Sequence, residues 1–206
     1  PPETDEFDGK DIGLQWQWSA NSNIVWYSKL ANQKFLRLFS IKTPENANNL
    51  WNVPNLLTQK FPSPNFTAST KVKLTPEDAT SGKIAGLVVM GTDYQSVVIT
   101  NKPDGFYLQL IRAEKAEKNN PEKVLFETKL KSNEAYLQVK VNDPNGICQF
   151  SYSENGKKYT DIGEPFQAKP GKWIGAKVGL YSISLKDAKR GGYADFDYFR
   201  ITNNKK

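Results

Sequence analysis

The stretch FTASTKVKL, from Phe66 to Leu74, alternates apolar and polar residues and decides the fold class. On a β-strand, successive side chains point to opposite faces. One face then carries Phe66, Ala68, Thr70, Val72 and Leu74, and the other carries threonine, serine and lysine. This pattern is typical of a strand with one face buried in a core.

The same period of two recurs along the chain. FYLQLIR (106–112) sets Leu108 and Leu110 opposite Tyr107 and Gln109, and AYLQVKV (135–141) alternates in the same way. Further strands are predicted in IAGLVVMG, SVVIT, VLFETKL, CQFSYS, KVGLYSIS and YADFDYFRI. Turn signals separate them, including PDG at 103–105 and DPNG at 143–146. Helix signals are weak, and RAEKAEKNNP (112–121) is compatible with a short helix or with a polar hairpin loop.

The strands predict an all-β fold with two packed antiparallel sheets, in one domain that covers residues 1–206. No apolar run approaches the roughly 20 residues that a membrane-spanning helix needs. The net charge is +6, but the lysines are scattered and alternate with acids. A solvated basic surface is therefore expected in place of a nucleic-acid interface.

The residue inventory excludes several kinds of catalytic site. The chain contains no histidine and one cysteine, Cys148. A serine–histidine–aspartate triad, a cysteine–histidine pair and a histidine zinc site are therefore excluded. Cys148 shares a predicted strand face with Phe150 and Tyr152, so a buried thiol is expected.

Four stretches, taken in order, carry a resemblance to a known module. They are DEFDGKDIGLQWQW, NLWNVPNLLTQKFP, AGLVVMGTDYQSVVI and the terminal pair GAKVGLYS and GGYADFDYFRI, and FSYSENGKKYTDIGEPFQA fits between them. The chain resembles the C-terminal β-sandwich of glycoside hydrolase family 43 β-xylosidases and arabinofuranosidases. The resemblance implies a concanavalin A-like jelly roll, and it extends over nearly the whole chain.

The family's catalytic carboxylates lie on a five-bladed propeller that is separate from this module. The resemblance therefore implies a non-catalytic accessory domain, excised from a larger, secreted or periplasmic glycosidase. Its expected partners are the N-terminal propeller of the same parent chain and a xylan-type polysaccharide. The expected roles are to stabilise the propeller, to shape the rim of its active site and to touch xylan.

Two alternatives stay open. A stand-alone concanavalin A-like hydrolase would need two carboxyl groups beside the scissile bond. The nearest match to the E-x-D-x-x-E pattern of such enzymes is ETDEFD, from Glu3 to Asp8. The other alternative is a basic lectin-like or interaction domain with a partner other than a sugar.

Acidic residues occur at both ends of the chain, which often run side by side in a jelly roll. Carboxylate oxygens brought together there suit Ca²⁺, and the resemblance implies a structural calcium at this seam. Asp195 is the first candidate ligand, and Glu6 and Asp8 are the next. Asp197 is expected to contact the ligand residues without binding the ion itself. The alternative is that these acids lie on the surface and pair with the many lysines.

The aromatic residues divide into core and contact candidates. Trp16 and Trp18 share one strand face, so core packing is expected for both. Trp51 lies in ENANNLWNVPNLL (45–57), a polar connection with no periodic reason to bury a large ring. The resemblance implies that a loop aromatic of the sandwich reaches the propeller's substrate pocket, and Trp51 falls near that position. The alternative is a ring packed on the domain's own core.

A second contact surface is expected on the polar side of the strands. If Leu108, Leu110, Leu137 and Val139 face the core, tyrosine and glutamine alternate on the outside. Rings and amides within reach of one another suit a glycan, and an ordinary solvated face is the alternative. The residues of this predicted surface are Tyr107, Gln109, Tyr136 and Gln138, with Tyr94 and Gln95 beside them.

Overall fold

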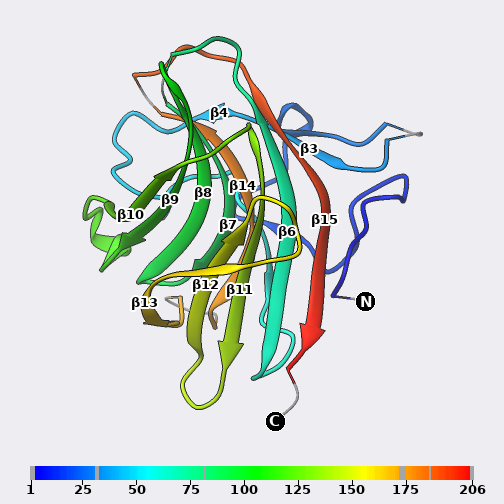
Figure 1. Ribbon diagram of the computed structural model, residues 1–206, viewed down its shortest axis with the longest axis vertical. Helices are drawn as coiled ribbons and strands as arrows, with labels where there is room; N and C mark the ends of the chain where they lie inside the picture. The colour runs from blue at the N-terminus through cyan, green and yellow to red at the C-terminus, as the bar shows by residue number, and fades with distance from the viewer. Residues whose placement is uncertain (1–2, 31–32, 81, 172–174, 186, 205–206) are drawn as a thin grey trace.

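The computed structural model describes residues 3–30, 33–80, 82–171, 175–185 and 187–204. It confirms the predicted β-sandwich (Figure 1). In the described ranges, no helix has the length and hydrophobicity needed to cross a membrane.

The first sheet has eight strands, and seven of them follow one another in an antiparallel order. The eighth, β4 (Ile41–Lys42), pairs in parallel with β14. From edge to edge the order is β1 (Gln17–Trp18), β5 (Leu57–Lys60), β14 (Lys177–Ser184), β7 (Lys83–Met90), β8 (Tyr94–Lys102), β9 (Gly105–Ala113) and β10 (Lys123–Lys129).

The second sheet has seven strands, all antiparallel. The order is β13 (Thr160–Gln167), β12 (Ile147–Ser153), β11 (Glu134–Asn142), β6 (Phe66–Thr75), β15 (Tyr193–Asn203), β3 (Leu36–Phe39) and β2 (Tyr27–Ser28). Two short 3-10 helices complete the described elements, η1 (Ile24–Trp26) and η2 (Ala116–Lys118). The helix η2 lies in the hairpin loop between β9 and β10, so both expectations for that loop hold in part.

The main core lies between the two sheets. The apolar residues of β6 are buried there, with Phe66, Ala68 and Val72 at 0% exposure. Leu108 and Leu110 of β9 meet Leu137 and Val139 of β11 in the same core, which confirms the predicted alternation. Burial of each such side chain stabilises the fold by roughly 1.5–3 kcal/mol.

A second apolar layer covers the outer face of the eight-stranded sheet. Residues 43–56, here called the covering segment, place three apolar side chains over this face. Because of that layer, β7 and β8 are buried on both faces and do not show the alternation of β6. The members of this layer are Leu50, Val53 and Leu56 of the covering segment, Ile84, Val88, Tyr94, Val98, Ile111, Ala113, Tyr181 and Ile183 of the sheet, and Ala116 of η2.

Polar contacts hold the covering segment on the sheet. The hydroxyl of Tyr94 accepts a hydrogen bond from the backbone N–H of Leu50 at 2.8 Å and donates one to Oε1 of Glu122 at 2.5 Å. The side chain of Asn49 donates to the carbonyls of Ala116 and Asn120 at 3.0 and 2.7 Å. Burial raises the pKa of Glu122, although the hydrogen bond from Tyr94 opposes that rise.

The N-terminal segment is fastened to the last strand. Asp5 and Phe199 exchange two backbone hydrogen bonds, of 2.8 and 2.7 Å. Figure 1 shows this segment in blue beside the red strand β15. The carboxylate of Asp5 also accepts hydrogen bonds from the backbone N–H groups of Phe7 and Gly13 and from the indole N–H of Trp16, at 2.9, 3.1 and 3.0 Å. The two ends of the chain therefore lie side by side, as expected for a jelly roll.

The expected core packing of the first tryptophans is confirmed for Trp16, which is 7% exposed and meets Phe199 edge-on. Trp18 is partly buried against the main core, with its ring centroid 5.3 Å from that of Trp26. Tyr27 packs beside Trp18 at 5.5 Å, so Trp26 and Tyr27 both contribute to the aromatic cluster.

We expect Asp5→Ala to lower the free energy of unfolding by about 2–4 kcal/mol, because each hydrogen bond to a charged group contributes about 1.5–3 kcal/mol. Urea unfolding followed by tryptophan fluorescence measures this loss. Asp8→Ala is the matched control, because Asp8 is exposed. Equal stabilities for the two variants would contradict the anchoring role of Asp5.

We expect Glu122→Gln to raise the free energy of unfolding by about 1 kcal/mol at pH 8. The pKa of Glu122 is raised in the folded state, so the stability linked to its proton is present below its ordinary pKa of 4.5. That stability is lost as the pH rises through the folded-state value. The difference between variant and parent should therefore shrink toward pH 4, as measured by urea unfolding at both pH values. A gain that stayed constant with pH would contradict this account.

Candidate functional site

The residues predicted to contact a glycan do not form one surface. Tyr94 and Gln95 are each 0% exposed, so the prediction of glycan contact is wrong for these two. Tyr94 lies under the covering segment, where burial raises the pKa of its hydroxyl. Gln95 faces the inside of the sandwich, where its Oε1 accepts a hydrogen bond from Nε of Arg112 at 2.8 Å.

The four remaining tyrosine and glutamine residues lie on opposite sides of the molecule. Tyr107 and Gln109 belong to β9 in the eight-stranded sheet, whereas Tyr136 and Gln138 belong to β11 in the seven-stranded sheet. All four point away from the core, as predicted, but the two pairs face outward from different sheets. The expectation of a shared surface is therefore wrong, because alternation distinguishes inside from outside and does not say which sheet a strand joins.

On the eight-stranded sheet, Tyr107 and Gln109 are hydrogen-bonded to acidic side chains close to them in the sheet. Tyr107 donates a hydrogen bond to Oδ2 of Asp104 at 2.6 Å, and Gln109 donates to Oε2 of Glu127 at 2.5 Å. Glu127 also binds Nζ of Lys102 at 2.7 Å. This arrangement is that of an ordinary solvated sheet face.

On the seven-stranded sheet, Tyr136 lies in a polar hollow of about 510 Å³, here called the tyrosine hollow. Its volume falls in the range of about 300–1,000 Å³ that is typical of ligand sites. The hollow brings together one predicted glycan residue and two predicted metal ligands. Its lining residues are Glu6, Asp8, Lys34, Lys71, Tyr136, Asp197, Tyr198 and Arg200.

The charged side chains of the tyrosine hollow are held in place by one another. Arg200 donates two hydrogen bonds to Glu6, at 2.6 and 2.8 Å, and stacks over the ring of Tyr198 at 3.8 Å. The bonds from Arg200 lower the pKa of Glu6, and burial raises the pKa of Tyr198 to about 12. Lys71 binds Asp197 at 3.2 Å. Two rings beside fixed donors and acceptors suit the faces and hydroxyls of a sugar.

Sequence reasoning missed Tyr198 as a contact residue, and a β-bulge explains why. The pairing of β15 with β6 shifts register between Phe196 and Phe199, which are both buried in the core. Three residue steps, in place of two, separate these inward side chains. Asp197 and Tyr198 both become available to the outer face. The wider spacing of Phe196 and Phe199 in YADFDYFRI was the available signal.

Two of the three predicted calcium ligands, Asp195 and Glu6, are paired with arginines, and the third, Asp8, is exposed. Both carboxylate oxygens of Asp195 accept hydrogen bonds from Arg37, at 2.8 and 2.9 Å, and both oxygens of Glu6 bind Arg200. In the described ranges no three acidic, histidine or cysteine side chains form a group that could hold a metal ion. As folded, this donor set does not fit calcium, and the paired-acid alternative describes Asp195 and Glu6, with arginine as the partner. A calcium at the seam stays a prediction of the resemblance alone.

Two of the four acids of the ETDEFD motif, Asp5 and Glu6, have structural roles in this arrangement, and Glu3 and Asp8 are exposed. The carboxylate of Asp5 holds Phe7, Gly13 and Trp16, and Glu6 is paired with Arg200. Neither group is placed as a free acid beside a second free carboxylate. Cys148 is 0% exposed, and burial raises the pKa of its thiol to about 12, so it is not poised as a nucleophile.

Trp51 lies on the covering segment and packs partly against the second apolar layer. Its backbone N–H donates to Oδ1 of Asn49 at 2.8 Å, in a segment whose other contacts fix it to the sheet. The ring is partly exposed. The ring therefore packs in part on the domain's own core, as the alternative expected. Another part of the ring is exposed, and the predicted contact with a neighbouring domain is untested.

Comparison with known proteins identifies the fold family. The model of the beta-xylosidase C-terminal concanavalin A-like domain matches residues 4–202. The chain is 25% identical, over 97% of its length, to a beta-xylosidase of Formosa agariphila. It spans 35% of that relative's length.

Solved structures give the same fold. A bifunctional GH43-CE protein of Bacteroides eggerthii superposes with a TM-score of 0.84 at 24% identity, over 98% of this chain and 26% of the other. A xylan beta-1,4-xylosidase of Bacillus halodurans superposes with a TM-score of 0.79 at 23% identity, over 98% of this chain and 39% of the other. With the family model matching almost the whole sequence, the chain belongs to the C-terminal concanavalin A-like domains of the GH43 beta-xylosidases.

Proposed function

We propose that this domain is a non-catalytic accessory module of a xylan-degrading GH43 glycosidase. In this proposal it packs against a propeller-type catalytic domain of the same polypeptide, stabilises it and contributes to the rim of its active site. The tyrosine hollow adds a weak contact to xylan-type chains. Relatives of the family are several-domain GH43 enzymes in which such a domain accompanies the catalytic domain.

The observation that carries the docking proposal is a group of exposed apolar side chains near the N-terminus. Leu14 and Ile24 are 91% and 86% exposed, and Leu30 and Val25 are 68% and 57% exposed. These four residues fall within the first 30 residues, which are the ones nearest to a domain that precedes this one in the chain. Large apolar side chains with such high exposure favour a protein contact over contact with water alone.

The proposal that this domain is non-catalytic is based on what covers the outer face of the eight-stranded sheet and on the acids found there. The covering segment packs over the part of the outer face of the eight-stranded sheet that β7, β8 and β14 form, so that part is occupied by the protein itself. Glu122, which is half-buried, accepts a hydrogen bond from Tyr94 there. Glycoside hydrolysis needs two carboxyl groups that flank the scissile bond.

Trp51 is proposed as the contribution to the active-site rim. Its covering segment is held by the contacts of Asn49 and Leu50, so the ring is presented from a fixed backbone. A rigidly held aromatic ring loses little conformational entropy on contact.

The docking proposal predicts the behaviour of the variant Leu14→Asp/Ile24→Asp. In a protein that contains both this domain and its catalytic domain, we expect the melting temperature of the catalytic domain to fall by about 3 °C or more. The cause is the burial of two charges at the interface between domains. Differential scanning calorimetry measures the shift.

Two controls accompany the docking test. The same double variant of the 206-residue domain alone should melt like its parent, because both positions are exposed. Val124→Asp should leave the two-domain protein unchanged, because Val124 is 54% exposed on β10 and outside the N-terminal group. No shift in the two-domain protein would contradict docking through Leu14 and Ile24.

The glycan contact predicts that xylooligosaccharides bind the isolated domain with a dissociation constant in the millimolar range. Tyr136→Ala should weaken this binding at least about tenfold, because the loss of one stacked ring removes about 1.5 kcal/mol or more. Titration calorimetry measures both affinities.

Tyr107→Ala is the matched control for Tyr136→Ala. It removes the same type of ring from the outer face of the other sheet and should leave the affinity unchanged. No heat at millimolar ligand, or an equal loss in the two variants, would eliminate the tyrosine hollow as a glycan contact while leaving the docking proposal intact.

A further inference from the structure

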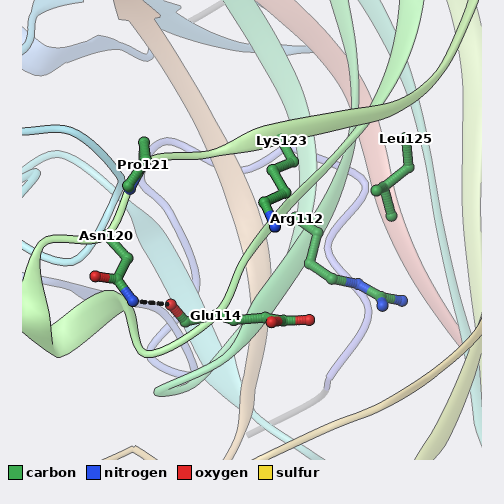
Figure 2. A pocket seen from close by; sticks show the side chains of 6 residues that line it. All are labelled: Arg112, Glu114, Asn120, Pro121, Lys123 and Leu125. Atoms are coloured by element: carbon green, nitrogen blue, oxygen red, sulfur yellow. Dashed lines mark hydrogen bonds between the residues drawn. The ribbon is translucent and has the colours of Figure 1, made fainter.

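A separate hollow of about 390 Å³ lies where β9 ends and β10 begins, beside the loop that contains η2. Figure 2 shows its lining side chains, which come from these two strands and from the loop between them. They are Arg112, Glu114, Asn120, Pro121, Lys123 and Leu125. This hollow, here called the arginine hollow, belongs to the eight-stranded sheet and shares no residue with the tyrosine hollow.

Arg112 is the positioned cation of the arginine hollow. Its Nε donates to Oε1 of the buried Gln95 at 2.8 Å, and its guanidinium lies 5.2 Å from the ring centroid of Phe166. Within the described part of the chain, neither terminal nitrogen of Arg112 has a hydrogen-bond or ion-pair partner. The fork of an arginine held in this way matches the two oxygens of a carboxylate.

Gln95 adds a second indication of a ligand. Its side chain is 0% exposed, and its Nε2 is a buried donor without a partner among the described residues. Such unpartnered donors are uncommon in folded proteins and require an explanation. This buried amide lies next to the guanidinium of the hollow, because its Oε1 accepts the hydrogen bond from Nε of Arg112.

The charges around the arginine hollow favour a monoanion. Arg112 and Lys123 supply two positive charges, and Glu114 supplies one negative charge. In the described ranges none of these three side chains makes a salt bridge within 4.0 Å. These three lining charges sum to +1, which one carboxylate neutralises, whereas a doubly charged phosphate would leave the hollow with an excess negative charge.

The rest of the lining suits a hydroxylated ring. Asn120 donates from Nδ2 to the carbonyl of Glu114 at 3.0 Å, which leaves its Oδ1 to accept a hydrogen bond. Leu125 is 45% exposed, and Pro121, at the other end of the lining in Figure 2, is exposed as well. The hollow thus combines a cation pair, oxygen acceptors and apolar surface.

From this geometry we propose that the arginine hollow binds an acidic sugar, with the carboxylate of a hexuronate on Arg112 and Lys123. The sugar hydroxyls face Glu114 and Asn120, and the apolar face of the ring contacts Leu125. Gln95 is a positioning residue that holds the guanidinium. The inference concerns this hollow alone and does not depend on docking or on the tyrosine hollow.

The test titrates the 206-residue domain with methyl glucuronide and with methyl glucoside, which differ in the carboxylate. Binding is followed by chemical-shift changes in NMR spectra. We expect methyl glucuronide to bind in the millimolar range and methyl glucoside to bind at least tenfold more weakly. Equal binding of the two sugars, or no binding of either, would overturn the proposal.

Titrations with acetate and with inorganic phosphate distinguish a site for an acidic sugar from a site that binds anions in general. We expect both to bind more weakly than methyl glucuronide, because they lack the hydroxylated ring or carry the wrong charge. If either binds as well as the glucuronide, the hollow is a general anion site and the proposal of a sugar ligand is wrong.

Three variants locate the site. Arg112→Gln should weaken glucuronide binding at least tenfold, and Lys123→Gln should weaken it several-fold. Arg190→Gln is the control, because it removes the same charge from an exposed position outside the hollow and should leave the affinity unchanged. If Arg112→Gln does not fold, the exposed Lys123 carries the test, and unchanged binding in Lys123→Gln would overturn the assignment.

Discussion

Burial of both faces of the eight-stranded sheet is the constraint on which the rest of the structure depends. Its inner face packs against the seven-stranded sheet, and its outer face packs against the covering segment. Hydrogen bonds fix that segment to the sheet: Tyr94 accepts one from the backbone N–H of Leu50, and the side chains of Asn49 and Asn55 donate to the carbonyls of Ala116 and Ser182. The face that a free-standing sandwich would leave open is therefore filled by the protein itself, and ligands are left with the edges and the other sheet.

At the seam between the chain ends, arginine side chains bind two of the acids that were predicted to bind calcium. Arg37 binds Asp195 through two hydrogen bonds, and Arg200 binds Glu6 in the same way. Both arginines also stack on tyrosine rings, at 3.7 Å over Tyr193 and 3.8 Å over Tyr198. Each carboxylate is thus paired with a positive charge, and the contacts of Arg200 with Glu6 and Tyr198 form part of the wall of the tyrosine hollow.

Much less of the candidate site than of the fold could be predicted from the sequence. Tyr136 was correctly expected to face outward, yet its neighbours in the hollow come from β6, β15 and the N-terminal segment. Gln95 was expected on the surface, because it follows Tyr94 in a polar turn sequence. The structure buries both residues, since β8 is covered on its two sides. Strand pairing and a bulge decide these neighbours, and neither leaves a strong local signal.

The sequence by itself determined the β class, the inward and outward faces of β6, β9 and β11, the exclusion of histidine chemistry and the family. These depend on local alternation and on residue types, which are readable along the chain. Only the tertiary structure decided which outward faces share a sheet, which acids meet arginines and which face the covering segment closes. Those outcomes depend on contacts between residues far apart in the sequence, such as Asp5 with Phe199 and Leu50 with Tyr94, and such contacts exist only once the sheets have formed.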